Sequence, residues 1–584
     1  MEEGHESRQR DRLRGETGTV RKDWGGRLSV ALAYPNTYRL GMSNLGFQVV
    51  YGLLNSLDHV VAERVFYPDE PEDPLLSGRG KGLRSLESLS PLIRFHAVAF
   101  SLPFENDFPN VLRMLEWGRI PILQDERDER HPLILGGGVT AFLNPEPLSR
   151  FFDAFFLGEA EAGLHVFLEA FHEGLARSRD RKSLLLRLSG RVPFLYVPSL
   201  YRPVYGPSGV LESMEVLAKD APRAIHVSRD AESGPPSVSV IRTSETEFGD
   251  KILVELGRGC GRSCRFCAAG YIYRPPRVRD REALIKAVEG SLGRTSSLGL
   301  ISPAVSDTPG VEEITGRILE LGGRFSVSSL RADSLTPDLL WKLEKAGQKS
   351  IAIAPEAGTE RLRRVINKHL TEEQLIRAVR MIASAGRFTL RLYFMIGLPT
   401  ETQEDIDGIV NLVKRLKHHI IKESRGRGTI GAVRLSVNCF VPKPFTPFQW
   451  HPMETTASLK EKQKRLRKAF TKEGGVTLSL DVPKWAYVQA LLSRGDRRAG
   501  VLLQRVHEAG GNWRQAFRES DVNPDFFVYR QRGVDEVLPW DHIDHGIAKK
   551  HLIQEYRRAL EGKESPQCTV GRCDRCGVCG TPSE

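Results

Sequence analysis

Short apolar strands alternate with amphipathic helices along most of this 584-residue chain. In the first two hundred residues, apolar runs occur at 28–35, 96–102, 132–137 and 153–158, and segments with helical spacing separate them. Parallel strands are buried on both faces and need helical crossovers, so this alternation predicts a parallel sheet covered by helices. The fold class we expect is therefore α/β, beginning with a doubly wound, Rossmann-like sheet.

A stricter βα rhythm follows. Six apolar strand candidates begin at Ile252, Leu298, Phe325, Ser350, Phe388 and Ala432. Helix start signals stand between them: Thr336 before Pro337, and the capping-box patterns Thr371-x-x-Gln374 and Thr402-x-x-Asp405. Six βα units do not complete an eight-fold barrel, so we expect a partial (β/α)6 TIM-type barrel that is open along one side.

These patterns divide the chain into six parts. We expect a mobile polar N-terminal arm that docks late, a Rossmann-like domain and a linker with short strands. A barrel core follows, then a mostly helical region with Trp485, Trp513 and Trp540 as packing anchors, and a Cys-rich metal-binding tail. In the same order, their bounds are 1–27, 28–199, 200–245, 246–452, 453–560 and 561–584.

Composition narrows the class of protein. Hydrophobic residues make up 40% and charged residues 27% of the chain, which is typical of globular proteins. No run approaches the roughly 18 uncharged apolar residues of a spanning helix, and the N-terminus has no apolar signal segment, so we expect a cytoplasmic protein with no membrane partner. The helix predicted at 458–470 has six lysines or arginines, and 418–428 adds more. A solvated face is the simpler explanation, and RNA stays open as a partner, although no RNA-binding module is recognisable.

Seven of the eight cysteines fall into two groups. The first group, Cys260, Cys264 and Cys267, has the spacing C-x3-C-x2-C directly after a predicted strand. Three thiolates this close can hold three irons of a cubane cluster and leave the fourth iron open for chemistry. The alternative is a structural zinc site that borrows Cys439 or His451 as its fourth ligand.

This motif, with Phe266 before the last cysteine and a βα barrel behind it, resembles the radical S-adenosylmethionine (SAM) superfamily. The resemblance implies that a [4Fe–4S] cluster binds SAM and reduces it to methionine and a 5′-deoxyadenosyl radical. It also implies an electron donor of the flavodoxin or ferredoxin type. The residues that it marks for cofactor contact, beside Phe266, are Ser302, Ser306 and Asp307 after the second strand, Ser328, Ser329 and Arg331 after the third, Glu356 after the fourth, and Ile396, Gly397 and Leu398 after the fifth. Helix caps and a rim salt bridge are the alternative roles for the serines and Glu356.

Three N-terminal segments, 33–55, 85–92 and 136–163, resemble radical SAM proteins with a cobalamin-binding-like domain. Ligands of open α/β sheets bind beyond the strand carboxyl ends, which places such a crevice at the loops Asn36–Gly46, Ser101–Asp107, Gly136–Asn144 and Gly158–Gly163. The cobalt-ligand motif D-x-H-x-x-G is absent. Cobalamin therefore stays open as a cofactor, beside a vestigial domain that serves as a lid or docking surface.

The second cysteine group is Cys568, Cys573, Cys576 and Cys579, with the spacing C-x4-C-x2-C-x2-C. Four thiolates can close a tetrahedral zinc site, which we favour slightly, or hold an auxiliary iron–sulfur cluster. A mobile tail with redox-active thiols is the third alternative.

Taken together, these features predict a radical SAM enzyme that modifies an unactivated C–H position, with methyl transfer through cobalamin left open. The alternatives are a methylthiotransferase-like enzyme of tRNA or ribosomal modification and a non-catalytic iron–sulfur scaffold or sensor. The sequence does not indicate the substrate.

Overall fold

The computed structural model describes residues 2–69, 82–230, 234–425, 431–570 and 573–579. Its N-terminal domain is a six-stranded sheet with the order β2-β1-β3-β4-β5-β6. The strands are β1 (Leu28–Tyr34), β2 (Val60–Phe66), β3 (Ala97–Ser101), β4 (Leu133–Gly137), β5 (Ala154–Phe156) and β6 (Leu195–Tyr196). All pairs are parallel except β5 with β6. The doubly wound sheet is confirmed.

The strand β2 is missing from the predicted set. It carries Glu63 and Arg64 in the middle of the strand, so its sequence does not form a continuous apolar run. The fully buried Arg64 guanidinium is neutralised by Glu16 and Glu87, each at 2.7 Å. Ion pairing therefore lets a charged segment occupy a buried strand position.

The helices α3 (Leu45–Ser56) and α6 (Ala160–Arg177) lie over one face of this sheet, and α4 (Phe108–Trp117) connects β3 to β4. The loop after β1 contains the short helix α2 (Tyr38–Met42). The N-terminal arm is not detached. After α1 (Glu2–Arg14), Val20 bonds to the Tyr51 hydroxyl and the Trp24 indole N–H donates to Glu63 at 2.8 Å.

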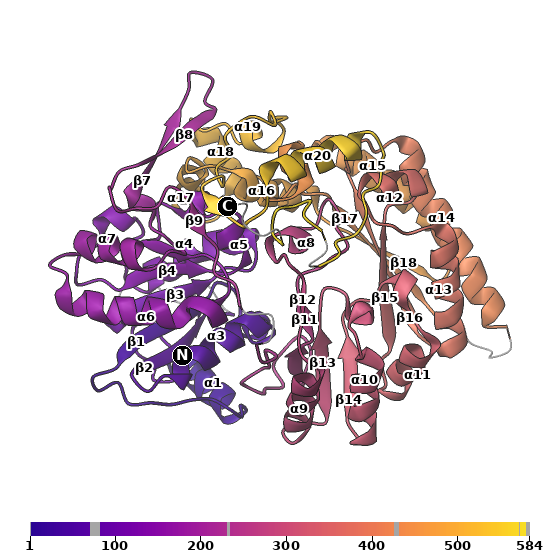
Figure 1. Cartoon of the computed structure of the whole chain (residues 1–584), viewed down its shortest axis with the longest axis horizontal. Helices are drawn as coiled ribbons and strands as arrows, with labels where there is room; N and C mark the ends of the chain where they lie inside the picture. The colour runs from indigo at the N-terminus through magenta and orange to yellow at the C-terminus, as the bar shows by residue number, and fades with distance from the viewer. Residues whose placement is uncertain (1, 70–81, 231–233, 426–430, 571–572, 580–584) are drawn as a thin grey trace.

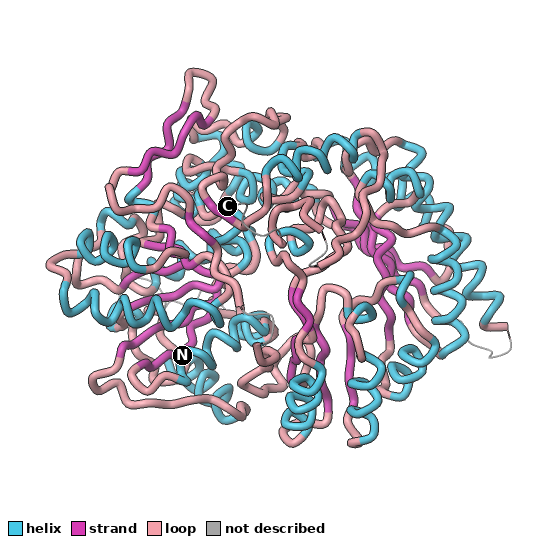
Figure 2. The backbone as a smooth tube through the Cα atoms, in the orientation of Figure 1, coloured by secondary structure: helices cyan, strands magenta, loops and turns pink. Residues whose placement is uncertain are grey.

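The second domain is an arc of parallel strands with helices outside it (Figures 1 and 2). It consists of two sheets. A hydrogen bond from Leu330 N–H to Ala352 O, at 2.9 Å, joins them. The strands are β10 (Ile252–Glu255), β13 (Ser297–Ile301), β14 (Arg324–Val327), β15 (Ser350–Glu356), β16 (Thr389–Ile396), β17 (Val433–Cys439) and β18 (Val476–Leu480). The helices between them are α9 (Arg281–Leu292), α10 (Val311–Glu320), α11 (Pro337–Lys345), α12 (Glu360–Val365), α13 (Glu372–Ala385) and α14 (Gln403–Glu423).

The strand β18 extends the six predicted strands to seven. It pairs in parallel with β17 over residues Val476–Leu480, in a region that the sequence predicts as helical. Every second residue of β18 is exposed, and in its sequence VTLSL apolar residues alternate with hydroxyl residues. Such alternation is typical of a strand with one exposed face, and β18 was missed because it lacks the continuous apolar run of the other barrel strands.

The C-terminal helices lie across both domains (Figure 1). They are α15 (Thr456–Phe470), α16 (Pro483–Arg494), α17 (Ala499–Glu508), α18 (Trp513–Glu519), α19 (Asp525–Val528) and α20 (Lys549–Leu560). Trp513 and Trp540 are buried as expected, whereas Trp485 is 44% exposed and does not anchor packing. Among the described residues, none of the helices combines the length and apolarity that crossing a bilayer requires.

Candidate active site

One closed loop carries the first three cysteines. After β10, the short strands β11 (Gly257–Arg258) and β12 (Arg277–Val278) pair antiparallel and hold the two ends of the loop together. Within it, Cys267 N–H donates to Cys264 O at 3.2 Å, and α8 (Ala269–Ile272) follows. Gly259 has φ +81°, and a Cβ there would collide with the Tyr273 carbonyl, so the entry to the loop requires glycine.

Burial disfavours the thiolate form of two of these cysteines. Burial raises the pKa of Cys267 to about 11, with the Cys264 and Cys260 thiols adding to the effect. It raises the pKa of Cys260 as well. Metal ligation by cysteine requires thiolates, so binding a cluster here must expel protons. Within the described ranges, no three Cys, His, Asp or Glu side chains are grouped around one metal position.

The two alternative zinc ligands are engaged elsewhere. Cys439 ends β17 and lies 4.0 Å from the amide nitrogen of Gln463. His451 Nδ1 lies 3.1 Å from the Tyr556 hydroxyl, a contact with helix α20. The donor set of the loop is therefore three thiols, which fits a cubane with one iron left open.

A network of charges lies beside the cysteine loop at the carboxyl ends of β13 and β14. Arg262, from the loop itself, pairs with Asp307 at 2.7 Å and with Asp333 at 3.1 Å. Arg331 also pairs with Asp333, at 2.9 Å. The structure thus brings the predicted residues Asp307 and Arg331 together through Arg262 and Asp333, which sequence analysis had not selected.

The predicted serines have mainly local roles. Ser306 Oγ lies 2.8 Å from Ser334 Oγ and accepts a hydrogen bond from Arg331 N–H at 3.3 Å. Ser302 Oγ accepts from Ala304 N–H at 3.3 Å, which fits a turn. Ser328 is exposed and Ser329 half-buried.

Glu356 has a strained backbone. It lies at the end of β15 with φ +66°, next to a register shift that begins at Ile353. Its carboxylate pairs with Lys368 Nζ at 3.3 Å, and the same ammonium lies 5.9 Å from the centre of the Phe266 ring. Lys368 therefore links two predicted site residues, and a left-handed conformation at a residue other than glycine is often kept for function.

The predicted turn after β16 has its backbone groups engaged. Gly397, with φ +85°, donates its N–H to Glu401 at 2.9 Å, and Ile396 O accepts from Phe440 N–H at 2.9 Å. Leu398 is buried. The turn lies on the same rim of strand ends as Glu356.

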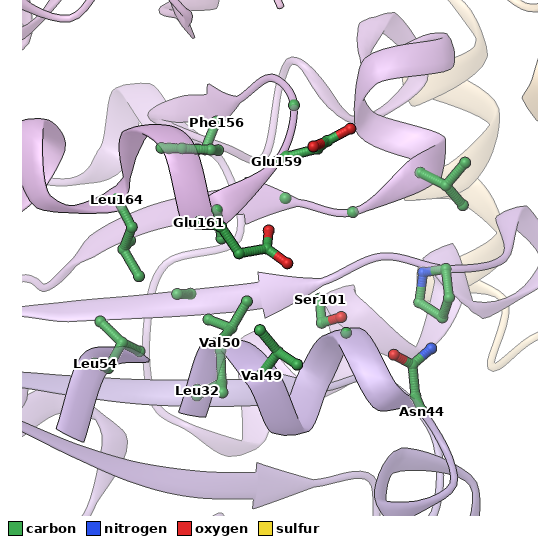
Figure 3. A pocket seen from close by; sticks show the side chains of 18 of the residues that line it. Leu32, Asn44, Val49, Val50, Leu54, Ser101, Phe156, Glu159, Glu161 and Leu164 are labelled. Carbon is green, nitrogen blue, oxygen red and sulfur yellow. The ribbon is translucent and has the colours of Figure 1, made fainter. Parts of the chain in front are cut away.

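A cavity of about 380 Å³ occupies the predicted crevice of the N-terminal sheet (Figure 3). Residues from all four predicted loops line it, namely Asn44–Gly46, Ser101 and Pro103, Gly136–Phe142 in part, and Gly158–Glu161. Leu32, Val50, Leu54, Phe156 and Leu164 form an apolar floor between α3 and α6. This size and lining are typical of a small-molecule site.

The barrel contributes the other wall of this cavity. Glu255, Arg258 and Tyr273 line it, and Arg258 and Tyr273 belong to the cysteine loop and its base. Arg258 pairs with Glu159 at 3.1 Å, with Glu161 at 2.7 Å and with Glu255 at 2.8 Å. The cavity therefore lies in the N-terminal crevice, and the base of the cysteine loop closes its other side. No single sequence motif pointed to Arg258, although it immediately precedes Gly259 and Cys260.

Comparison with known proteins agrees with this architecture. Residues 46–198 match the family described as radical SAM proteins, N-terminal, and residues 254–413 match the radical SAM superfamily. An uncharacterized protein of Methanocaldococcus jannaschii is 30% identical over 477 residues, which is 81% of this chain and 90% of that protein. The chain belongs to the radical SAM superfamily. As in other radical SAM proteins, its cofactors are a [4Fe–4S] cluster and SAM, and it is an enzyme of this superfamily.

Other similarities are more distant. The tRNA-2-methylthio-N(6)-dimethylallyladenosine synthase of Anaplasma phagocytophilum is 25% identical over 261 residues, which cover 41% of this chain and 57% of that enzyme. The radical SAM methyltransferase TsrM of Kitasatospora setae, solved with cobalamin and a [4Fe–4S] cluster, superposes with a TM-score of 0.45 at 11% identity. That alignment covers 92% of this chain and all of TsrM.

Proposed function

We propose that this radical SAM enzyme holds its cluster on Cys260, Cys264 and Cys267 and modifies an unactivated C–H position of its substrate. The observation that carries the proposal is the closed loop with its three thiols, while Cys439 and His451 contact other residues. When bound, the cluster supplies the electron that cleaves SAM to methionine and a 5′-deoxyadenosyl radical.

The charged rim suits the amino-acid end of SAM. Asp307 offers a carboxylate to an ammonium group, and Arg331 offers a guanidinium to a carboxylate. Arg262 keeps Asp307 in place by ion pairing at 2.7 Å. Glu356, aimed by its strained backbone and Lys368, is the proposed acceptor for a ribose hydroxyl or the ammonium group.

The cavity between the domains is the proposed seat of cobalamin as a methyl carrier. Its apolar floor suits the nucleotide tail of a corrinoid, and Gly138, with φ +101°, lets its loop pack closely against the Leu102 backbone, where a Cβ would collide. No histidine is among its described lining residues, so the chain provides no imidazole for cobalt there. Cobalamin binding without a histidine ligand is thus part of the proposal.

A methylthiotransferase-like modification of tRNA or ribosomes is the second candidate. It is supported by the similarity to the tRNA synthase and by the second cysteine group, which provides ligands for an auxiliary cluster. The proposed reductant for either reaction is a flavodoxin or ferredoxin in the reducing cytoplasm.

SAM cleavage by the reduced protein tests the shared chemistry. After anaerobic reconstitution, wild type with dithionite and SAM should produce 5′-deoxyadenosine and methionine. Cys264→Ala should lose the product and the part of the absorbance that this cluster contributes. Cys439→Ala is the matched control, because this thiol is equally buried but belongs to neither group, and it should retain both. Product formation by Cys264→Ala at the wild-type rate would contradict the proposal.

Cobalt content separates the two candidates. Wild type incubated with hydroxocobalamin and desalted should retain about one cobalt per chain. Ala99→Leu, which adds bulk inside the cavity, should retain much less while its melting temperature and SAM cleavage stay near wild type. Absence of cobalt in wild type would leave the methylthiotransferase-like reaction as the better candidate.

A further inference from the structure

The second cysteine group lies against the loop that carries the first. Beyond α20, Cys568 N–H donates to Gly261 O at 2.8 Å, and Gly261 directly follows Cys260. At the other side of the group, Cys576 O accepts from Ala548 N–H at 3.0 Å, at the start of α20. Both contacts use backbone atoms, so they leave the thiols available as ligands.

A buried arginine holds the segment that leads to the second cysteine group. Arg265, with no exposed surface, pairs with Glu555 of α20 at 3.1 Å and donates to Lys563 O at 2.8 Å. It also donates to Ser565 Oγ at 3.0 Å, and Ser565 N–H donates to Asn367 Oδ1 at 2.8 Å. Protein contacts therefore hold the residues that lead to Cys568, which argues against a loose tail.

Three of the four thiols face one small space. A cavity of about 10 Å³ is lined by Cys568, Cys573 and Cys576 together with Ser263, Arg274, His551, Glu555, Ser565, Pro566 and Arg575. Cys576 is only 3% exposed. Arg274 is also buried and donates to Ser263 Oγ at 2.8 Å, so one guanidinium connects this space with the first cysteine loop. Arg575 Nε lies 3.3 Å from Cys573 Sγ.

The guanidinium groups of Arg274 and Arg575 line the same space as these sulfurs. Thiolates are the form that binds thiophilic metals, and hydrogen bonds from arginine to sulfur tune such sites from outside the ligand set. Cys579 follows Cys576 by three residues and supplies the fourth thiol. Within the part of the chain that the structure describes, neither cysteine group is arranged around a single metal position. The two groups are alike in this.

We propose that Cys568, Cys573, Cys576 and Cys579 hold a second metal centre with four thiolate ligands, seated on the cluster loop. Four thiols release four protons to solvent as the centre forms. Zinc and an iron–sulfur cluster share this ligand chemistry. The centre fixes the tail on the loop at Gly261, so it serves to position the loop, and the inference goes beyond the proposed function because it needs no SAM chemistry.

A variant that lacks the first three thiols isolates this centre. The full-length chain with Cys260→Ala, Cys264→Ala and Cys267→Ala is reconstituted anaerobically, once with zinc alone and once with iron and sulfide, and then desalted. The proposal expects about one zinc in the first arm or two to four irons in the second, and the arm that fills identifies the metal. The matched variant, which adds Cys573→Ala and Cys576→Ala, should hold neither. Equal metal in the two variants, or none in either, overturns the proposal.

A second measurement avoids dependence on the triple variant. Wild type and the double variant Cys573→Ala/Cys576→Ala are reconstituted in parallel. The double variant should lack the metal of the second centre and keep about four irons at the first. Hydrogen exchange at residues 259–263 should rise in the double variant, because the tail no longer holds Gly261. Identical metal content would overturn the proposal. Failure of SAM cleavage in wild type with the tail metal present would instead contradict only the proposed function.

Discussion

At the scale of single residues, Glu356 combines a predicted role with an unfavourable backbone. Its φ of +66° lies in the left-handed region, which costs a residue with a Cβ about 1 kcal/mol relative to glycine. Glu356→Gly should therefore be more stable than Glu356→Ala by about 1 kcal/mol, although both lose the carboxylate. Melting temperatures of the two variants test the strain.

The same pair of variants tests the function of this side chain. Both should bind SAM about tenfold more weakly than wild type, because a hydrogen bond to a charged group contributes on the order of 1.5–3 kcal/mol. Weakening in Glu356→Ala alone would assign the effect to the backbone instead of the carboxylate. Isothermal titration with SAM on reconstituted protein provides the comparison.

Sequence alone predicted some site residues and not their connections. The thiols of Cys260, Cys264 and Cys267 follow from spacing, because ligand geometry is encoded locally. Arg262, Asp333 and Lys368 were not selected, since their roles depend on three strand ends meeting at one rim. A single sequence does not specify which of its many charges a fold brings together.

At the scale of elements, helix starts were the best predicted feature. Thr336 caps α11 with Pro337 behind it, and the patterns at Thr371 and Thr402 form the capping boxes of α13 and α14. Caps are local, so four residues suffice to identify them. The strand β2 was missed because a buried ion pair interrupts its apolar run, and β18 because its apolar residues alternate with hydroxyl residues instead of forming a continuous run.

The capping box of α13 gives a measurable prediction. Thr371 Oγ1 accepts from Gln374 N–H at 3.2 Å, and Gln374 Oε1 accepts from Thr371 N–H at 2.9 Å. Thr371→Ala should lower the free energy of unfolding by about 1 kcal/mol, whereas Thr371→Ser should keep nearly all of it. Thermal melts of the two variants measure this stability. Equal losses of stability in both would contradict the role of the cap.

At the scale of the whole molecule, one buried carboxylate joins three regions. Glu105, 4% exposed, follows β3 of the N-terminal domain. It pairs with Lys443, which follows β17 of the barrel, and accepts from Gln489 of α16 at 3.0 Å. The cavity lies between these same two domains, so this contact helps to fix the distance between its walls.

Acid should weaken this junction. Burial opposes ionisation, but Lys443 and Gln489 outweigh it and hold the pKa of Glu105 below its usual value of 4.5. A lowered pKa in the folded state contributes stability above about pH 4.5, and this stability is lost as the pH falls through the folded pKa. Glu105→Gln should therefore lower the melting temperature at pH 7, because it leaves the Lys443 charge without its partner, at a cost of about 3 kcal/mol.

The pH dependence distinguishes ionisation from packing. Because protonated glutamate resembles glutamine, the difference between wild type and Glu105→Gln should shrink as the pH falls through the folded pKa. Glu373→Gln, at a side chain that is 84% exposed, should melt like wild type throughout. No difference between wild type and Glu105→Gln at pH 7 would mean that Glu105 acts through its shape alone. In that case the spacing of the two domains, and with it the cavity, would not depend on this charge.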